Sequence, residues 1–582
     1  MPGPLVHPGS KASISNHLAR PWHTGGLASL RPIHWIIPLL ALSVVLCIAP
    51  SYAQPASPPV VTIDSGTLAG AQFGAPNEVM FLGIPFAAPP TGDRRWRPPQ
   101  PVQPWKGTRN ASVFGPACPQ APDDIENLKS YAAETPGAAP HLNFQTSEDC
   151  LSLNVWTAAW GKPGKLPVMV WIHGGGNIFG TGQYPPFGQS LSRKGVVFVS
   201  LQYRLGALGF LAHPALTAES PHHASGNYAI LDQIAALQWV RRNVAQFGGD
   251  PHNVTVFGES AGGVMVCYLM ASPQAHGLFE RAILESCTCR DYVSPELKTL
   301  RYYEGGSGTS EQIGLRLERD LGIAPGAGAL ARLRAAPADQ ILRAASRDPG
   351  LNFYAGGTVD GWVLPEQPAV IFAAGRQAHV PVITGSNADE GSVFRALLHP
   401  PALQNYRAWL KSHFLEQADD VFRAYPAASD ATAPAAFQAL HDDYLRGATV
   451  HALVRDMARA GSPAYLYYFT YTGKGTYADL GSFHGLDLAF VGGGFFRPSR
   501  WGAPDAADLN LAAVMSAYWT QFAATGDPNR AGLPPWPRFD PRTDLCLELG
   551  TNVHLRPVPH AARFALFYRS LKARLAATPK PE

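Results

Sequence analysis

The segment from Val254 to Gly263 constrains the fold of this chain more than any other. It opens with the β-branched and aromatic run Val254-Thr-Val-Phe257, which predicts a buried strand. The pattern Gly258-Glu-Ser260-Ala-Gly262 follows, and the apolar run from Gly263 to Met270 suits a buried helix. Strand, tight turn and helix in this order predict a nucleophile elbow, which presents the Ser260 hydroxyl above a sheet. Side chains two positions either side of the serine would collide there, and glycine at both positions removes that collision.

Taken alone, the G-x-S-x-G pattern also fits a glycine-rich structural turn, so the segments around it matter. Further unbroken apolar runs predict buried strands, and stretches with helical spacing lie between them, such as Tyr228 to Phe247. The predicted strands are Pro167–Ile172, Val196–Leu201, Val254–Phe257, Arg281–Ser286 and Val380–Thr384. Apolar strands separated by helices predict an α/β fold with a large, mostly parallel central sheet and helices on both faces.

A glycine run follows the first of these strands and predicts a binding site for negative charge. His173-Gly-Gly-Gly176 comes directly after Ile172. Acyl transfer places negative charge on a carbonyl oxygen, and backbone N–H groups can stabilise that charge. We expect the N–H groups of Gly175, Gly176 and Ala261 to form such an oxyanion hole. The alternative is an ordinary glycine loop that caps a strand, and His173 itself fits a structural role better than a catalytic one.

The first 53 residues have the composition of an export signal. Lys11, Arg20 and Arg31 precede an apolar stretch from Trp35 to Ile48, and Ser51-Tyr-Ala53 offers small residues for cleavage. The apolar stretch, about 14 residues long, is short for a membrane span. We therefore predict a Sec-type signal peptide at 1–53, a single domain at 54–582, and a secreted or periplasmic protein. A retained membrane anchor is the alternative, and the long lead leaves the true start codon open.

Charge and cysteine content narrow the possible functions. The formal charge of +3 over 582 residues argues against a nucleic-acid binder. Export permits disulfides, and Cys118 and Cys150 enclose a loop that a disulfide would staple. Cys267 lies on the predicted buried helix and is expected to be an inert core residue. The pairing of four cysteines stays open, namely Cys267, Cys287, Cys289 and Cys546.

Together these motifs resemble the type-B carboxylesterase/lipase family of α/β-hydrolases, which includes cholinesterases, bile-salt-activated lipase and bacterial p-nitrobenzyl esterases. In style the chain is closest to secreted bacterial carboxylesterases. The matching stretches span nearly all of the expected mature chain: Gly83–Pro90, Glu148–Trp156, Trp171–Gly176, Tyr203–Phe210, Gly226–Gln233, Phe247–Pro251, Gly258–Gly262, Thr525–Asn529 and Leu533–Pro537.

The resemblance implies which residues would work with Ser260. The family's acid loop matches Gly385 to Ser392, which implies Glu390 as the acid and leaves Asp389 as the nearest rival. The family's histidine loop matches Phe483-His-Gly485, which implies His484 as the base. The resemblance further implies supporting roles for Glu259 and Ser286, a Cys118–Cys150 disulfide, and no metal or other cofactor.

Two departures from the family bear on the substrate. Residues 119–149 contain no tryptophan, so the platform that stacks on choline in cholinesterases is missing and choline esters are not the expected substrate. The segment Ser286-Cys-Thr-Cys289 replaces a serine-glycine that helps shape the acyl pocket, so pocket size stays open.

The expected function is therefore that of a secreted serine carboxylesterase, which hydrolyses uncharged carboxylic esters through an acyl-enzyme intermediate. The alternatives are a catalytically silent adhesion or binding module of the same fold, and an interfacial lipase. The expected partner is a small-molecule ester, with no nucleic acid and no stable membrane anchor after signal removal. The physiological substrate, the acyl and alcohol preference and the oligomeric state stay open.

Overall fold

The structure is a computed structural model that describes most of the chain from residue 57 to residue 576. The gaps within this range are residues 123–125, 127–128, 130–140, 144, 163–164, 184, 289–301, 304–305, 348–355, 395–401 and 494–497. The predicted signal peptide at 1–53 lies outside the described residues. Residues Ser57–Glu582 make up one compact unit.

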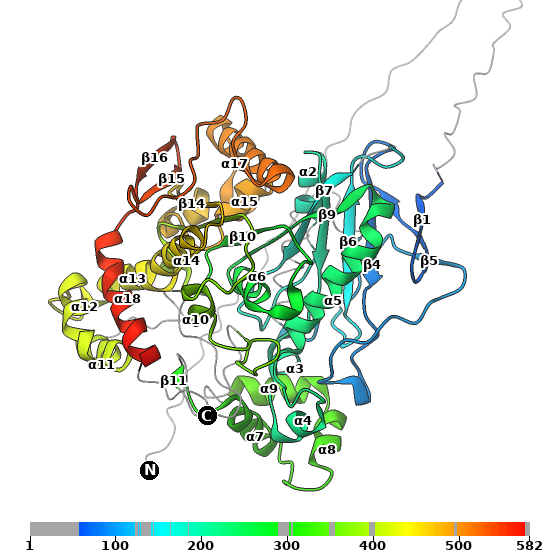
Figure 1. Ribbon diagram of the computed structural model, residues 1–582, viewed down its shortest axis with the longest axis horizontal. Helices are drawn as coiled ribbons and strands as arrows, with labels where there is room; N and C mark the ends of the chain where they lie inside the picture. Colours follow the sequence, from blue (N-terminus) through cyan, green and yellow to red (C-terminus); the bar gives the residue numbers. More distant parts are fainter. Residues whose placement is uncertain are drawn as a thin grey trace, which may run out of the picture. The chain divides into compact units, whose positions relative to one another are not determined.

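An 11-stranded sheet runs through this unit (Figure 1). Its order is β16-β15-β14-β13-β10-β9-β7-β8-β6-β4-β3. All neighbours from β8 to β15 pair in parallel, whereas the strands at both edges pair antiparallel. The predicted large, mostly parallel sheet is thus confirmed. The strand bounds are β3 Ala71–Gln72, β4 Val79–Pro85, β6 Ser152–Thr157, β7 Leu166–Ile172, β8 Val197–Leu201, β9 Gly249–Glu259, β10 Arg281–Glu285, β13 Val382–Asn387, β14 Ala464–Phe469, β15 Leu545–Leu549 and β16 Val553–Pro557.

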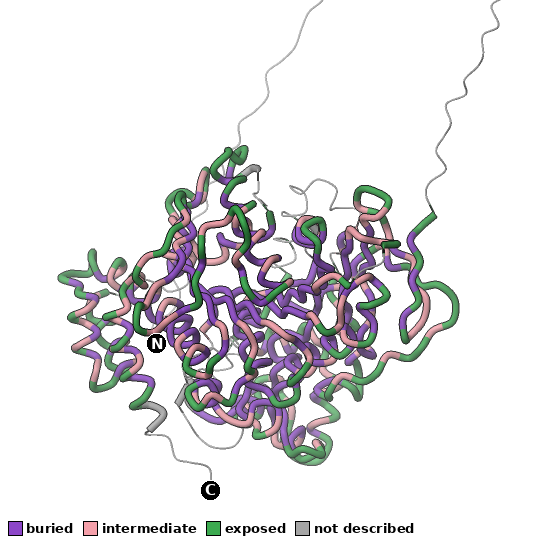
Figure 2. The backbone as a smooth tube through the Cα atoms, turned by 45° about the horizontal axis from the view of Figure 1, so that its top comes forward, coloured by how far each residue is buried: buried purple, intermediate pink, exposed green. Residues whose placement is uncertain are grey.

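Both faces of the sheet are covered because alternate residues of its strands are apolar on each side. On β7, Met169 and Trp171 pack with α2 (Pro185–Ser192), α15 (Asp487–Val491) and α17 (Ala506–Thr525). Val168, Val170 and Ile172 of the same strand pack with residues of α5 (Tyr228–Asn243), α6 (Ala261–Ala271) and α14 (Ala448–Arg459) on the other side. Figure 2 shows the central strands as buried backbone, with exposed segments at the periphery.

The remaining elements lie around this three-layer core. A small sheet consists of β1 Val60–Ile63, β2 Gly66–Ala69 and β5 Thr108–Asn110, and β1 and β2 pair antiparallel as a hairpin. The other helices and short strands are η1 Gly92–Arg94, α3 Gly206–Phe210, α4 Pro214–Glu219, η3 Val244–Phe247, η4 Pro273–Ala275, β11 Tyr302–Tyr303, β12 Gly306–Ser307, α7 Ser310–Asp320, α8 Ala329–Ala335, α9 Ala338–Arg347, α10 Pro368–Ala373, η5 Glu390–Phe394, η8 Gly475–Leu480 and α16 Pro498–Trp501.

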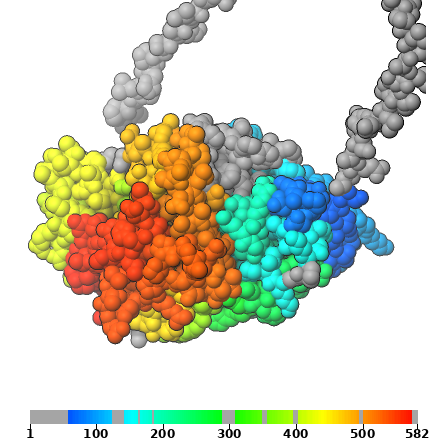
Figure 3. All heavy atoms as spheres, turned by 90° about the horizontal axis from the view of Figure 1, so that it is seen from above, coloured from blue at the N-terminus to red at the C-terminus, as the bar shows by residue number. Residues whose placement is uncertain are grey.

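A second helical layer with its own apolar core lies at the β14 side of the sheet. It comprises α11 Leu403–Phe414, η6 Leu415–Gln417, α12 Ala418–Ala424, α13 Ala433–His441 and α18 Ala561–Ala576, which meet around a cluster of buried aromatic side chains. A π-helical turn, η7 (Asp442–Gly447), joins α13 to α14 and contacts the start of η5. In Figure 3 the yellow, orange and red C-terminal segments lie side by side, and the blue N-terminal segments lie at the opposite end.

Candidate active site

Ser260 occupies the sharp turn between β9 and α6. Its backbone has φ 56° and ψ −125°, a strained conformation for a residue with a side chain. The flanking glycines are required by close backbone packing. A Cβ at Gly258 would lie 2.5 Å from the carbonyl carbon of Gly262, and a Cβ at Gly262 would lie 2.1 Å from the oxygen of Ile172. The steric reason predicted for both glycines is thus confirmed.

Replacing Gly262 by alanine should therefore damage the turn. The new methyl group would press on the backbone oxygen of Ile172, which cannot move without shifting β7, so we expect a loss of about 3 kcal/mol in the free energy of unfolding. Gly161→Ala is the matched control, since a Cβ there meets nothing within 4 Å and only its positive φ of 73° is strained. Denaturant unfolding of both variants measures the difference, and equal stabilities would contradict the steric argument.

The predicted oxyanion loop lies directly against this turn. A Cβ on Gly174 would be 3.2 Å from the Cβ of Ser260. Gly175 and Gly176 have φ values of 102° and 60°, which glycine adopts without strain. In the part of the chain that the structure describes, no group accepts a hydrogen bond from the backbone N–H of Gly175, Gly176 or Ala261. These three donors are available to a ligand atom.

His173, next to this loop, has a structural environment. Its ring stacks on Tyr203 with ring centroids 4.4 Å apart, and its Nδ1 lies 2.9 Å from the carbonyl oxygen of Gly174. Burial lowers the pKa of His173 to about 4, so the ring is neutral at pH 7.

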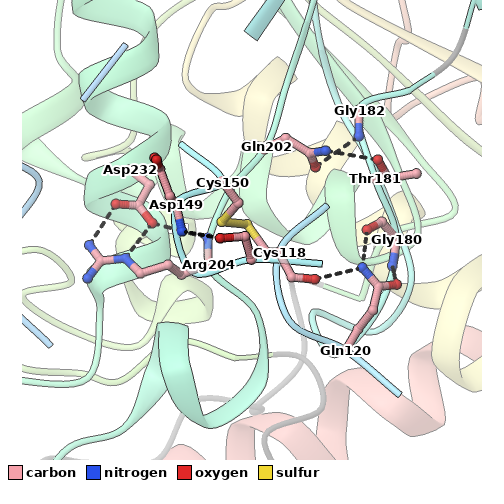
Figure 4. Close-up of a disulfide and its surroundings, with 11 residues drawn as sticks. Cys118, Gln120, Asp149, Cys150, Gly180, Thr181, Gly182, Gln202, Arg204 and Asp232 are labelled. Carbon is pink, nitrogen blue, oxygen red and sulfur yellow. Dashed lines mark hydrogen bonds and ion pairs between the residues drawn. A yellow bond between two sulfur atoms is a disulfide. The ribbon is translucent and has the colours of Figure 1, made fainter. Parts of the chain in front are cut away.

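The Cys118–Cys150 disulfide supports the far end of the same loop (Figure 4). The bond is present, as the resemblance implied. Beside it, the side-chain amide of Gln120 donates to the carbonyl oxygens of Cys118 and Gly180, and its oxygen accepts from the N–H of Gly180. The disulfide-bonded segment is thereby attached to the residue that ends the glycine-rich loop.

The bonding of Cys267 differs from the prediction. Cys267 on α6 is disulfide-bonded, so its description as an inert core residue was wrong. Its burial on the helix was predicted correctly, but a single-residue pattern carries no information about a bonding partner. Cys546 lies buried on β15 as a thiol.

Glu390 and His484 meet at the carboxyl ends of β13 and β14. The imidazole Nδ1 lies 2.5 Å from Oε2 of Glu390. The other carboxylate oxygen accepts from the Ser286 hydroxyl at 2.6 Å and from the Asn387 N–H at 2.8 Å. Because Nδ1 donates to the carboxylate, Nε2 of the neutral ring carries a lone pair and can accept a proton.

Asp389, the rival acid, has a different role. Its carboxylate accepts the N–H of Ser482 at 2.8 Å, and its own N–H donates to the Ser482 carbonyl at 3.0 Å. Asn387 adds a hydrogen bond from its side-chain amide to the Phe483 carbonyl at 2.7 Å. Asp389 and Asn387 therefore join the acid loop to the histidine loop, and Glu390 is the residue that contacts the ring.

The histidine loop also reaches the serine turn. Nε2 of His484 is 3.1 Å from Oε1 of Glu259, the residue before Ser260, but without the alignment of a hydrogen bond. Among the described residues, Nε2 has no hydrogen-bond partner, and the Ser260 hydroxyl makes no hydrogen bond to His484. Such contacts often form only when a substrate is bound.

Charges around the ring shift the pKa values of the three groups. Burial raises the pKa of Glu259 to about 7. Burial opposes charge on His484, but the carboxylates of Glu259 and Glu390 raise its pKa above the usual value of 6.5. Burial also opposes charge on Glu390, yet the charge of His484 and the hydrogen bonds from His484 and Ser286 hold its pKa below the usual value. Glu390 is thus ionised at neutral pH.

Further buried acids lie close by that the sequence analysis did not select. Glu285 accepts the indole N–H of Trp519 at 2.7 Å, and Asp487 accepts the Tyr467 hydroxyl at 2.9 Å. Burial raises the pKa of Glu285 well above its usual value and that of Asp487 to about 6. Glu285 interrupts the apolar run of β10, and Asp487 lies three residues after His484. A charged residue within or close to an expected site segment is the signal that could have identified both.

The fold and this arrangement define the class of protein, an α/β-hydrolase. A serine lies on a strand–helix turn, an imidazole–carboxylate pair lies beside it, and the neighbouring backbone donors have no acceptor among the described residues. The carboxylesterase family model matches residues 57–567, and the chain belongs to that family. It is a carboxylic ester hydrolase, and its substrates are small-molecule esters.

Individual relatives agree with this family. The chain is 39% identical over 502 residues to fumonisin B1 esterase of Sphingopyxis macrogoltabida, covering 84% of this chain and 86% of the relative. It is 33% identical to liver carboxylesterase of Sus scrofa, covering 89% and 94%. A solved structure described as a thermophylic PNB esterase superposes with a TM-score of 0.75 at 30% identity, covering 88% of this chain and 100% of that one. Of the helices that the structure describes, none combines the length and apolar character of a membrane span.

Proposed function

We propose that the protein is a secreted serine carboxylesterase that hydrolyses uncharged carboxylic esters through an acyl-enzyme, with Ser260 as nucleophile, His484 as base and Glu390 as acid. The observation that carries the proposal is the contact of His484 with both sides of the site. One ring nitrogen binds Glu390, and the other lies 3.1 Å from Glu259, the neighbour of Ser260.

In this mechanism His484 takes the proton of Ser260 through Nε2 as the serine oxygen attacks the ester carbonyl. Glu390 fixes the tautomer of the ring and stabilises the imidazolium that forms. The imidazolium then protonates the leaving alcohol, and the neutral ring next activates a water molecule that releases the acyl group. Ser286 and Asn387 hold the Glu390 carboxylate in place during both steps.

The negative charge of each tetrahedral intermediate would be stabilised by the N–H groups of Gly175, Gly176 and Ala261. Their lack of acceptors among the described residues supports this role, since a donor already in use could not serve the intermediate. One such donor is worth about 3–4 kcal/mol of transition-state stabilisation. A silent binding module would not need to keep three unpaired donors beside a strained serine.

The substrate is proposed only as a class. Relatives of similar coverage carry names as different as fumonisin B1 esterase and liver carboxylesterase, so family membership does not select one ester. The missing tryptophan of residues 119–149 favours uncharged over choline esters. Secretion is proposed from the signal-like residues 1–53.

The rate should depend on pH through His484. The base must be neutral to take the serine proton, so kcat/KM falls as pH drops through the pKa of His484, which the neighbouring carboxylates raise above 6.5. We expect the acid limb for p-nitrophenyl butyrate to lie above pH 6.5. Removing one of these charges with Glu259→Gln should move the limb to lower pH.

Glu416→Gln, an exposed substitution on η6, is the control and should leave the limb in place. A flat kcat/KM profile between pH 5 and 8 in the unmodified enzyme would contradict the assignment of His484 as base.

A further inference from the structure

A buried arginine lies beside the carboxylate of the Glu390–His484 pair. Arg446 belongs to the π-helical turn η7, and its Nε is 4.0 Å from Oε2 of Glu390, with side-chain exposures of 7% and 2%. Its Nε is fully buried and has no hydrogen-bond partner among the described residues. A buried, poorly solvated cation is costly, so its position beside the acid requires an explanation.

Arg446 faces groups of both signs from several elements. These are Glu390 of η5, Glu259 before the serine, His484, and His441 of α13. Asp487 of α15 and Asp442 of η7 interact electrostatically with Glu390. Burial lowers the pKa of His441 to about 4 and raises that of Asp442 to about 8, so both are neutral at pH 7. Among the described residues around Glu390, Arg446 is therefore the side chain that is always positively charged.

We propose that Arg446 is a positioning residue for the ester hydrolysis, whose charge keeps Glu390 ionised and keeps His484 neutral until it takes the serine proton. This inference rests on the proposed function. Two carboxylates, Glu390 and Glu259, border one imidazole, and without an opposing charge they would hold a proton on the ring. A ring that is already protonated cannot act as base, so the guanidinium shifts the ring toward its active form.

The separation of Arg446 from Glu390 makes the proposal specific. Arg446 would act on Glu390 through charge, because the 4.0 Å separation lies beyond hydrogen-bond range. A lysine at this position should therefore preserve the function, whereas an uncharged side chain of similar length should not.

The experiment compares Arg446→Met, Arg446→Lys and the unmodified enzyme. An organophosphonate titrates the active sites, so kcat/KM for p-nitrophenyl butyrate refers only to folded, reactive enzyme. For Arg446→Met we expect the acid limb to move up by about one pH unit, as a charge at this range implies. At pH 7, kcat/KM should then fall by about three- to tenfold. Arg446→Lys should restore most of both. Arg423→Met, an exposed arginine on α12, is the control for loss of a charge.

Other outcomes overturn the inference. An unchanged limb in Arg446→Met, or a limb that moves equally in Arg446→Lys, would show that the charge is not the cause. A loss confined to KM for esters that carry a free carboxylate would instead make Arg446 a substrate-binding residue. Failure of the proposed function is distinguishable, because Ser260→Ala would then keep its activity whatever Arg446 does.

Discussion

Ser260→Ala should lose ester hydrolysis almost completely, with kcat lowered by about 10⁴- to 10⁶-fold. The substitution removes the hydroxyl that we propose as the nucleophile. It should leave the fold unchanged, since alanine retains the Cβ that the strained turn at φ 56° already accommodates. Residual catalysis would come from the backbone donors and from binding. Hydrolysis of p-nitrophenyl acetate and covalent labelling by an organophosphonate measure the effect.

Ser412→Ala, an exposed substitution on α11, is the control and should label and turn over like the unmodified enzyme. Labelling that persists in Ser260→Ala would show that another serine is the nucleophile. An unlabelled but fully active variant would remove the acyl-enzyme mechanism altogether.

Glu390→Gln should lower kcat by about 10⁴-fold, close to the effect of an amide in place of the acid of a serine triad. The amide can still accept from Ser286 and Asn387. However, it can present an N–H to Nδ1 of His484, which would favour the tautomer with the proton on Nε2, and that ring cannot accept the serine proton. It also removes the negative charge that stabilises the imidazolium. Initial rates at saturating substrate measure the loss.

Asp389→Asn is the matched control, because an amide oxygen can replace the carboxylate that accepts the Ser482 N–H. We expect its kcat to stay within a factor of about ten, since a neutral hydrogen bond is weaker by about 1 kcal/mol. A larger loss in Asp389→Asn than in Glu390→Gln would make Asp389 the acid.

The central strands were predictable because their signal is local. β7, β8, β9 and β10 each contain a short, mainly apolar run, and the helix α5 has regular apolar spacing, so neighbouring residues alone carry the information. The strands β14, β15 and β16 were not among the predictions. β14 is rich in tyrosine, and β15 and β16 form a short edge hairpin whose pairing depends on the rest of the sheet.

Like the fold, the site has parts that the sequence predicts and parts that only the structure shows. The sequence by itself determined the serine turn and the glycine loop, because both are short local patterns, Gly258–Gly262 and His173–Gly176. The contact with Ile172 that requires glycine at Gly262 is visible only in the structure. Only the tertiary structure decided that Glu390 faces the ring while Asp389 faces Ser482, since adjacent side chains of one loop point in different directions. It also brought Arg446 to Glu390 from 56 residues away in the chain, a separation at which no periodic sequence pattern predicts a contact. Local turns can be predicted from neighbouring residues, whereas the electrostatics of a buried site depend on which distant segments meet there.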